Sequence, residues 1–431
     1  MRRLAIALAL LLTLVSIGRS LAQGEITVVS QNYDNHFPKD ITFHLQAQGN
    51  QDISKITLYY QIGASTSYAY AYPTFTPGRS VQAEHVMQTS GTRYVTPGSE
   101  IKYYYEIEDS GGNKLKTDQY DMTYLDTRFN WKTMQGDQFT VYWYASEQIA
   151  QQVFRSSQAT LAKMKTEAGQ SLQQPVRVWV YRDKQEMDVA LPFQSQTTSQ
   201  DIITQGQAFP DANEVFILGS DPAVVSTTAH ELTHLITEQL TSNAFSRIPT
   251  WLNEGLSMYA EGELRPANQS ALNAAIRNNS LLNLRAMSSL PGRPEQVNLF
   301  YGEAYSIVRY LIDTYGSEKM SELLATFKQG TSTSDALMKV YGLSLDQLEA
   351  NWRAAIGAQP APSAGAETGA SSQPQNIPTI VPFGSKQPQT APTAEQPQAP
   401  SNNTTVYVVL AASAVVLSLV FVVGLAFARR R

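Results

Sequence analysis

The run HELTH at residues 230–234 constrains this chain most, because it places two histidines four residues apart. On an α-helix the side chains of residues i and i+4 lie on one face, so both imidazoles can reach one metal ion. The carboxylate of Glu231, between them, would then stand beside an attacking water molecule and could act as its base. The pattern therefore predicts a metal-binding helix, provided that a third ligand lies elsewhere.

A candidate third ligand lies in the run WLNEG at residues 251–255, where we expect a second helix. Hydrolytic zinc sites have three protein ligands and one position left for water. The chain contains no cysteine, so only histidine and carboxylate ligands are possible. We predict that His230, His234 and Glu254 bind one zinc ion. The alternative carboxylates are Glu238, Glu261 and Glu263.

The histidine pattern alone is weak evidence, because two histidines and a glutamate recur by chance on amphipathic helices. Here, however, His230 and His234 are the only histidines after residue 85. Histidine in this part of the chain is thus confined to the predicted metal site, which strengthens the interpretation.

Together the two runs resemble those of gluzincin zinc metallopeptidases, in particular the peptidase-MA-like group and, more distantly, the membrane alanyl-aminopeptidase family. The resemblance covers residues 128–356 and is strongest at residues 226–263. It implies an α+β thermolysin-like fold in which Glu254 is the third zinc ligand and Glu231 the general base. Nineteen residues separate His234 from Glu254, one more than is usual in the aminopeptidase branch. The supporting residues that it implies are Asn253 and Gly255.

A peptidase of this kind also needs a hydrogen-bond donor for the oxyanion of its tetrahedral intermediate. No histidine remains for this role, and tyrosine is the natural substitute. Tyr301 lies in a segment that resembles the one where the aminopeptidase branch keeps its catalytic tyrosine, and Tyr305 is the alternative. Both could instead be packing residues of a helix that ends near residue 314.

The segment before the metal helix departs from the aminopeptidase branch, which carries G-x-M-E-N there and binds the amino end of its substrate with the glutamate. Residues 213–219 instead read NEVFILG. We expect an edge strand at 214–218 that pairs with an extended peptide through backbone hydrogen bonds. This favours endopeptidase over aminopeptidase activity, with amine binding by Glu214 as the alternative.

The catalytic domain predicted at residues 128–357 combines strands and helices. Residues 192–212, rich in Gln, Thr and Ser, are expected to form a surface loop. A capping side chain at Ser220 or Asp221 and the proline that follows predict a metal helix from about residue 222 to 240. The other expected elements are strands at 139–144, 175–181 and 214–218, a helix at 147–167, and helices as far as residue 356.

Residues 24–126 predict a separate all-β domain. Apolar and polar residues alternate at 41–47, 56–60 and 103–107, and turn residues such as Gly49-Asn50 separate the runs. Such a series of short runs is typical of an immunoglobulin-like or fibronectin-like β-sandwich. Its partner is not indicated. If this domain carries the function, the chain is a surface adhesion or binding protein with a catalytically silent metallopeptidase-like domain.

The two ends of the chain carry membrane-related patterns. Residues 1–22 have the charged, apolar and small-residue parts of a secretory signal peptide. Residues 359–404 are rich in Pro, Gln, Ala and Ser and predict a disordered stalk. Residues 406–428 contain no charge and are long enough for one transmembrane helix. Three arginines at 429–431 then predict a cytoplasmic tail, and hence a single-pass protein of the cell membrane with an extracellular body.

The net charge of -5 argues against nucleic acid as a main partner, because phosphate binding requires clusters of lysine and arginine. The predicted partners are a peptide or protein substrate and the membrane. The predicted function is hydrolysis of peptide bonds by a zinc-dependent peptidase.

Overall fold

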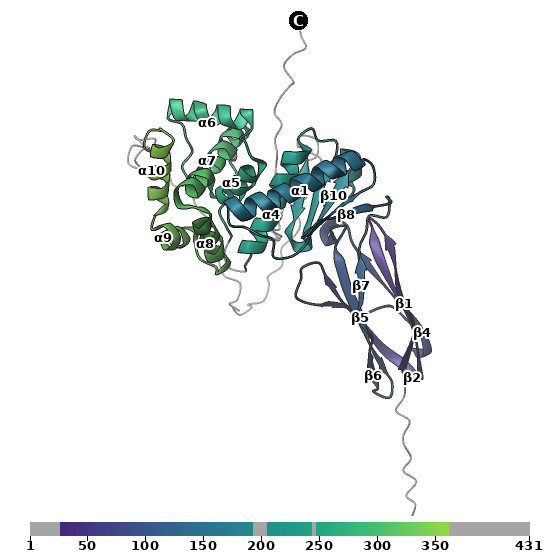
Figure 1. The fold of residues 1–431 in the computed structure, drawn as a ribbon. Coiled ribbons are helices and arrows are strands. Elements are labelled where there is room, and N and C mark those ends of the chain that lie inside the picture. The colour runs from purple at the N-terminus through teal and green to yellow at the C-terminus, as the bar shows by residue number, and fades with distance from the viewer. Residues whose placement is uncertain (1–25, 193–204, 244–246, 362–431) are drawn as a thin grey trace, which may run out of the picture.

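The computed structural model describes residues 26–192, 205–243 and 247–361. The predicted signal peptide and transmembrane helix lie outside these ranges, as does the predicted stalk from residue 362 onward. Within the described ranges, none of the helices has both the length and the apolar character needed to cross a membrane. The chain forms an N-terminal sheet-rich domain followed by a largely helical domain (Figure 1).

The N-terminal domain is built on one long strand, β2, whose two halves have different neighbours. Strands β1 and β4 pair with its first half, and β3 and β5 pair with its second half, all antiparallel. Strands β6 and β7 pair with β5. Alternate side chains from both halves form a separate hydrophobic core. The strands are β1 (Ile26–His36), β2 (Asp40–Ile62), β3 (Ala69–Ala71), β4 (Gly78–Gln88), β5 (Glu100–Asp109), β6 (Lys114–Lys116) and β7 (Tyr120–Thr123).

The break expected at Gly49-Asn50 is wrong, because β2 continues through it. The pairing of β2 with β4 is irregular between Gln48 and Ile53, and its pairing with β5 begins at Ile53. The glycine therefore marks the place where β2 exchanges one set of partners for another. Local sequence does not distinguish such an irregularity from a turn, because both favour the same small and polar residues.

The second domain begins with a mixed five-stranded sheet in the order β11-β12-β10-β9-β8. The three central strands are parallel, and β11 and β8 are antiparallel to their neighbours. The strands are β8 (Lys132–Gln135), β9 (Phe139–Trp143), β10 (Val176–Tyr181), β11 (Gly206–Phe209) and β12 (Glu214–Leu218). The strands at 139–144, 175–181 and 214–218 are thus confirmed to within a residue.

The two faces of this sheet are covered differently. Val178 and Val180 face one core together with α1 (Glu147–Glu167) and α4 (Val224–Thr241). Trp179 and Tyr181 face the other way, into a largely aromatic cluster that includes Met187 of α2 (Lys184–Asp188). Both faces of the central strands are therefore buried, as is usual for parallel strands.

The prediction of Glu214–Leu218 as the edge strand is wrong. This segment is β12, which lies inside the sheet, and β11 is the edge strand among the described residues. Strand β11 falls within the expected loop at 192–212. Its four residues are too few to show a period-2 pattern, so its strand conformation depends on pairing with β12.

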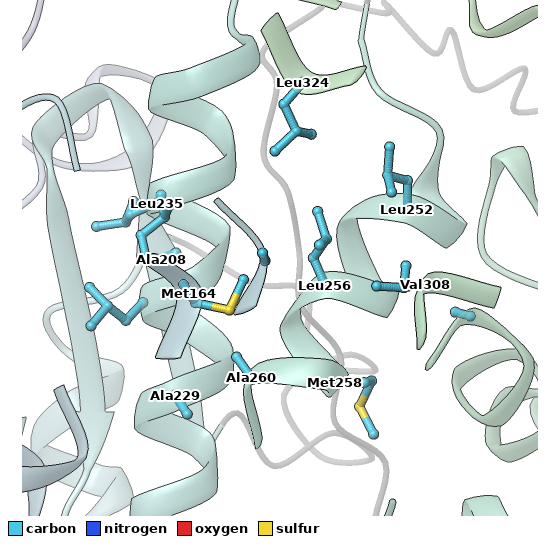
Figure 2. Close-up of a cluster of buried hydrophobic side chains, with 14 of the residues drawn as sticks. Met164, Ala208, Ala229, Leu235, Leu252, Leu256, Met258, Ala260, Val308 and Leu324 are labelled. Carbon is cyan, nitrogen blue, oxygen red and sulfur yellow. The ribbon is translucent and has the colours of Figure 1, made fainter. Parts of the chain in front are cut away.

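The rest of the domain is helical, as predicted. The helices are α5 (Thr250–Glu261), α6 (Pro266–Asn278), α7 (Val297–Tyr315), α8 (Ser317–Lys328), α9 (Thr333–Tyr341) and α10 (Leu345–Ala355). Figure 2 shows α5 between α4 and α7: Leu252 and Leu256 lie between Leu235 of α4 and Val308 of α7. Helices α4, α5 and α7 share this core, which holds the metal-helix segment in place.

Helix α4 begins two residues later than expected, at Val224. The Asp221 carboxylate accepts hydrogen bonds from the Ala223 amide at 2.9 Å and from the Thr227 hydroxyl at 2.6 Å. Asp221 therefore ties down the first turn of the helix, but the predicted cap is wrong: Ala223 is the N-cap residue and makes no side-chain cap hydrogen bond, and Pro222 lies before the helix.

Candidate active site

The structure brings His230, His234 and Glu254 together from two helices. His230 Nε2 lies 3.4 Å from Glu254 Oε2, and His234 Nε2 lies 3.8 Å from the same oxygen. The two imidazole centroids are 4.8 Å apart. All three side chains are at most 2% exposed. Helix α4 supplies both imidazoles from one face, and α5 presents the carboxylate to them.

These residues fit a zinc ion. Their three ligand atoms are buried and have no hydrogen-bond partner among the described residues, although buried polar atoms normally have one. The donor atoms lie within 4.8 Å of one another. Zinc–ligand distances of about 2.0–2.2 Å in a tetrahedral arrangement put neighbouring ligand atoms roughly 3.4 Å apart. Two nitrogens and one carboxylate oxygen are a donor set that zinc accepts in hydrolases.

The charges around the site favour a cation. Burial would lower the pKa of His230, but contacts with Glu254 and Glu261 outweigh it and raise that pKa to about 10. Burial would raise the pKa of Glu254, but His234 and His230 outweigh it and lower that pKa. Burial lowers the pKa of His234 to about 4. At neutral pH His234 is thus neutral and Glu254 ionised, the forms in which both can bind a metal, whereas His230 is protonated and would release that proton when a metal binds.

Further hydrogen bonds orient the two imidazoles. Glu261 Oε1 lies 2.7 Å from His230 Nδ1, and Ser257 Oγ lies 3.2 Å from His234 Nδ1. Because these contacts engage Nδ1 of each ring, they leave Nε2 of both rings facing Glu254. Arg265 in turn donates to Glu261 Oε2 at 2.8 Å.

Glu261 was expected as an alternative ligand, but its carboxylate contacts Nδ1 of His230, whereas Nε2 of that ring faces Glu254. Ser257 was missed altogether. Both could have been found from spacing, since residues 254, 257 and 261 share one face of α5 at positions i, i+3 and i+7. Of the other rivals, Glu263 lies after α5 on the surface, and Glu238 lies near the end of α4.

Glu231 is fully buried next to the edge strand. Its carboxylate oxygens have no hydrogen-bond partner in the described part of the chain. A Cβ atom at Gly206 of β11 would lie 2.7 Å from Glu231 Cγ, so only glycine lets the strand pass this close. Burial raises the pKa of Glu231 to about 7, although His230 opposes the rise. A carboxylate with a pKa near neutrality is suited to accept and return a proton.

Tyr301, and not Tyr305, has its ring next to that of His230. The centroid of its ring is 6.5 Å from that of His230, and the residue is 6% exposed. Burial, with Glu254 and Glu231 nearby, raises the pKa of Tyr301 well above its usual value, so the hydroxyl keeps its proton. Tyr305 lies one turn further along α7 and interacts with Arg309.

Gly255 sets the spacing between α5 and α7. A Cβ atom here would lie 2.4 Å from the Ala304 carbonyl oxygen and 2.6 Å from Val308 Cγ2. Any side chain would therefore push the two helices apart. Because Glu254 and Tyr301 stand on these helices, the glycine of WLNEG controls the distance between them.

Glu214 does not lie with these residues. It stands at the far end of the β11–β12 hairpin from Gly206. Its fully buried carboxylate accepts hydrogen bonds from Arg177 and Trp179, and burial raises its pKa to about 8. The carboxylate is thus engaged within the protein and not available to bind a substrate amine.

Comparison with known proteins gives one family match. Residues 156–358 match the model of the Peptidase MA superfamily. The match contains α4, α5 and α7 and supports a metallopeptidase-like domain. No curated protein sequence matches the chain.

Several solved structures are similar in part. An M1 zinc metallopeptidase from Deinococcus radiodurans is 14% identical, with 74% of this chain and 89% of that chain covered, at a TM-score of 0.29. A carbohydrate-binding module family 56 beta-1,3-glucan binding domain is 14% identical, with 23% of this chain and 98% of that chain covered, at a TM-score of 0.16. Similarities at these scores decide neither fold nor function.

Removal of the ligand Glu254 should weaken zinc binding more than removal of the Glu261 hydrogen bond to His230. Loss of an outer hydrogen bond to a ligand typically weakens metal binding by about 10- to 100-fold, and we expect this for Glu261→Gln. Glu254→Ala should weaken zinc binding by more than about 100-fold, because it removes a ligand outright. Competition with a fluorescent chelator measures both. Glu263→Ala is the matched surface control, and an affinity for Glu254→Ala equal to that of the control would contradict the assignment.

Proposed function

We propose that this protein is a zinc-dependent peptidase. The observation that carries the proposal is the buried cluster of His230, His234 and Glu254 with the carboxylate of Glu231 on the same helix. The family match over residues 156–358 supports the same chemistry. A purely structural metal site would use four protein ligands, whereas this one offers three among the residues that the structure describes.

The chain's own residues supply the proton transfers. When bound, zinc supplies a Lewis acid that acidifies water and polarises the scissile carbonyl. Glu231 accepts the proton of the attacking water and then passes it to the leaving amine. Tyr301 donates its hydroxyl hydrogen to the oxyanion that forms on the carbonyl. The raised pKa of both groups supports these roles.

The edge strand supports cleavage within a peptide chain. Strand β11 reads Gly206-Gln207-Ala208-Phe209 and carries no ionisable side chain. It therefore offers backbone hydrogen bonds to an extended substrate, with no carboxylate to hold a free amino end. Glu214, the one acidic candidate for amine binding before the metal helix, is engaged with Arg177 and Trp179.

We further propose that the enzyme works outside the cell, held to the membrane by one C-terminal helix. The support is the sequence pattern of residues 1–22, 359–404 and 406–428, which resembles a signal peptide, a stalk and a membrane span. Substrates would then be extracellular peptides or proteins.

The base is tested by Glu231→Gln. The amide cannot accept the proton, so kcat should fall by about 10²- to 10⁴-fold while zinc remains bound. Peptide-library cleavage followed by mass spectrometry, together with metal analysis, measures both. Turnover at the wild-type rate would exclude Glu231 as the base. Stoichiometric zinc without turnover by the wild-type protein would instead favour a binding protein with a silent domain.

The oxyanion donor is tested by Tyr301→Phe, with Tyr305→Phe as a matched control on the same helix. Loss of one oxyanion donor typically lowers kcat by about 10²- to 10³-fold. We expect this for Tyr301→Phe with KM little changed, because the bond forms in the transition state. Steady-state kinetics on one peptide measure kcat and KM of both variants and of the wild type. A loss in kcat for Tyr305→Phe alone would reverse the assignment.

The site of cleavage is tested with one peptide in two forms, with a free and with an acetylated amino end. An endopeptidase should cleave both at the same internal bond with kcat/KM values that differ by less than about threefold, because it does not bind the terminal amine. Mass spectrometry of the products identifies the bond. Release of the first residue from the free form only would establish an aminopeptidase.

A further inference from the structure

The hairpin β11–β12 joins the candidate active site to the N-terminal domain. At one end, Gly206 of β11 packs against Glu231 and Thr227 of α4. At the other end, the short helix η2 (Pro210–Ala212) connects β11 to β12. This connection, with the strand residues beside it, contacts the N-terminal domain at three places.

The first contact is made by the loop after β2. The Ala64 amide donates a hydrogen bond to the Asp211 carbonyl oxygen at 2.8 Å. Gly63 beside it has φ +56°, and a Cβ atom there would lie 2.6 Å from the same oxygen. Two independent reasons thus favour glycine: its left-handed backbone and the close approach of Asp211.

The second contact surrounds Glu214, the first residue of β12. Gly98 of the N-terminal domain has φ +103°, and a Cβ atom there would lie 2.7 Å from the Glu214 carboxylate. Arg177 Nη1 donates to Glu214 Oε1 at 3.0 Å, and Nη2 of the same side chain donates to Glu100 of β5. One guanidinium therefore links a carboxylate of each domain.

The third contact is aromatic. The ring of Tyr94 from the N-terminal domain lies 6.2 Å, centroid to centroid, from that of Phe209, the last residue of β11. The Tyr94 hydroxyl donates to the Ala190 carbonyl oxygen at 2.7 Å, which fixes the ring against the second domain. Together, Gly63, Ala64, Tyr94 and Gly98 form what we call the hairpin grip.

From these contacts we propose that the hairpin grip positions β11 for substrate. Strand β11 has only four residues, so a shift of its Phe209 end would displace the strand beside Glu231. Displacement by about 1 Å at a reacting centre can cost on the order of 100-fold in rate. The proposal rests on the peptidase function above and gives the N-terminal domain a part in it.

An independent binding module would not need this arrangement. Such a module would be expected to meet its neighbour through a polar surface that permits relative motion. Here two glycines with left-handed backbones are packed against the hairpin, and a buried carboxylate faces the interface. The three contacts converge on one hairpin, the one that carries the edge strand.

Gly63→Ala tests the proposal, because its added methyl group would meet Asp211. Gly112→Ala is the matched control: Gly112 also has a left-handed backbone, with φ +83°, but a Cβ atom there meets nothing within 4 Å. Gly112 lies in the turn between β5 and β6, at the far end of the domain from the helices (Figure 1). The pair separates the effect of backbone strain from that of contact with the hairpin.

The measurements are kcat/KM on an internally cleaved peptide, zinc content, and amide hydrogen exchange at residues 206–218. For Gly63→Ala we expect kcat/KM to fall by about 10- to 100-fold, with zinc retained and exchange faster at the hairpin. Gly112→Ala should match the wild type in all three. If Gly63→Ala does not fold, Gly63→Asn replaces it. Its Cβ atom still meets the Asp211 carbonyl oxygen, but the backbone strain is smaller because asparagine tolerates a left-handed backbone.

Failure of the proposal and failure of the peptidase function are distinguishable. If the Gly63 variants unfold at lower temperature but keep the kcat/KM and hairpin exchange of Gly112→Ala, the contact is merely structural and the proposal is overturned. If the zinc-loaded wild type cleaves no peptide, the peptidase function fails. Positioning for peptide cleavage then fails with it, and hydrogen exchange decides only whether the hairpin grip orders the hairpin: faster exchange at residues 206–218 shows that it does, and unchanged exchange overturns that part too.

Discussion

The second domain buries two imidazoles and three carboxylates, those of Glu231, Glu254 and Glu261, between helices that share one hydrophobic core. Buried charges are costly unless they are paired or bind a metal. The protein meets this cost with opposite charges placed close together, His230 with Glu254 and Glu261, and with three donor atoms aimed at one point. The packing of α4, α5 and α7 follows from this requirement, because it must hold these groups in register.

Close packing of the helices holds these buried groups together. Gly255 lets α5 approach the backbone of α7, so that Glu254 and Tyr301 stand near His230 from two different helices. Gly206 does the same for the edge strand, which passes directly beside Glu231. At both positions the missing side chain lets the backbone or the Glu231 side chain come close, so tight packing assembles the candidate site as much as its polar residues do.

The N-terminal domain packs against the part of the second domain that lies next to the candidate site. Its contacts converge on the hairpin that carries the edge strand, and Arg177 links Glu214 to Glu100 across the interface. The exposed tyrosines Tyr70 and Tyr72 lie elsewhere on the domain, where Tyr59 and Tyr70 are paired across β2 and β3. The interface explains why a buried carboxylate occurs at the start of β12, which the sequence pattern left as a possible amine-binding group.

The sequence by itself determined the elements whose evidence is local. The i, i+4 spacing of HELTH predicted the metal-helix segment, the helix at 147–167 has the bounds expected of it, and β10 and β12 lie where strands were expected. Only the tertiary structure decided which strand lies at the edge, that β2 continues past Gly49, and that Glu261 orients His230. These depend on pairing and packing between segments far apart in the chain, and a four-residue strand such as β11 has no periodicity of its own from which its place could be predicted.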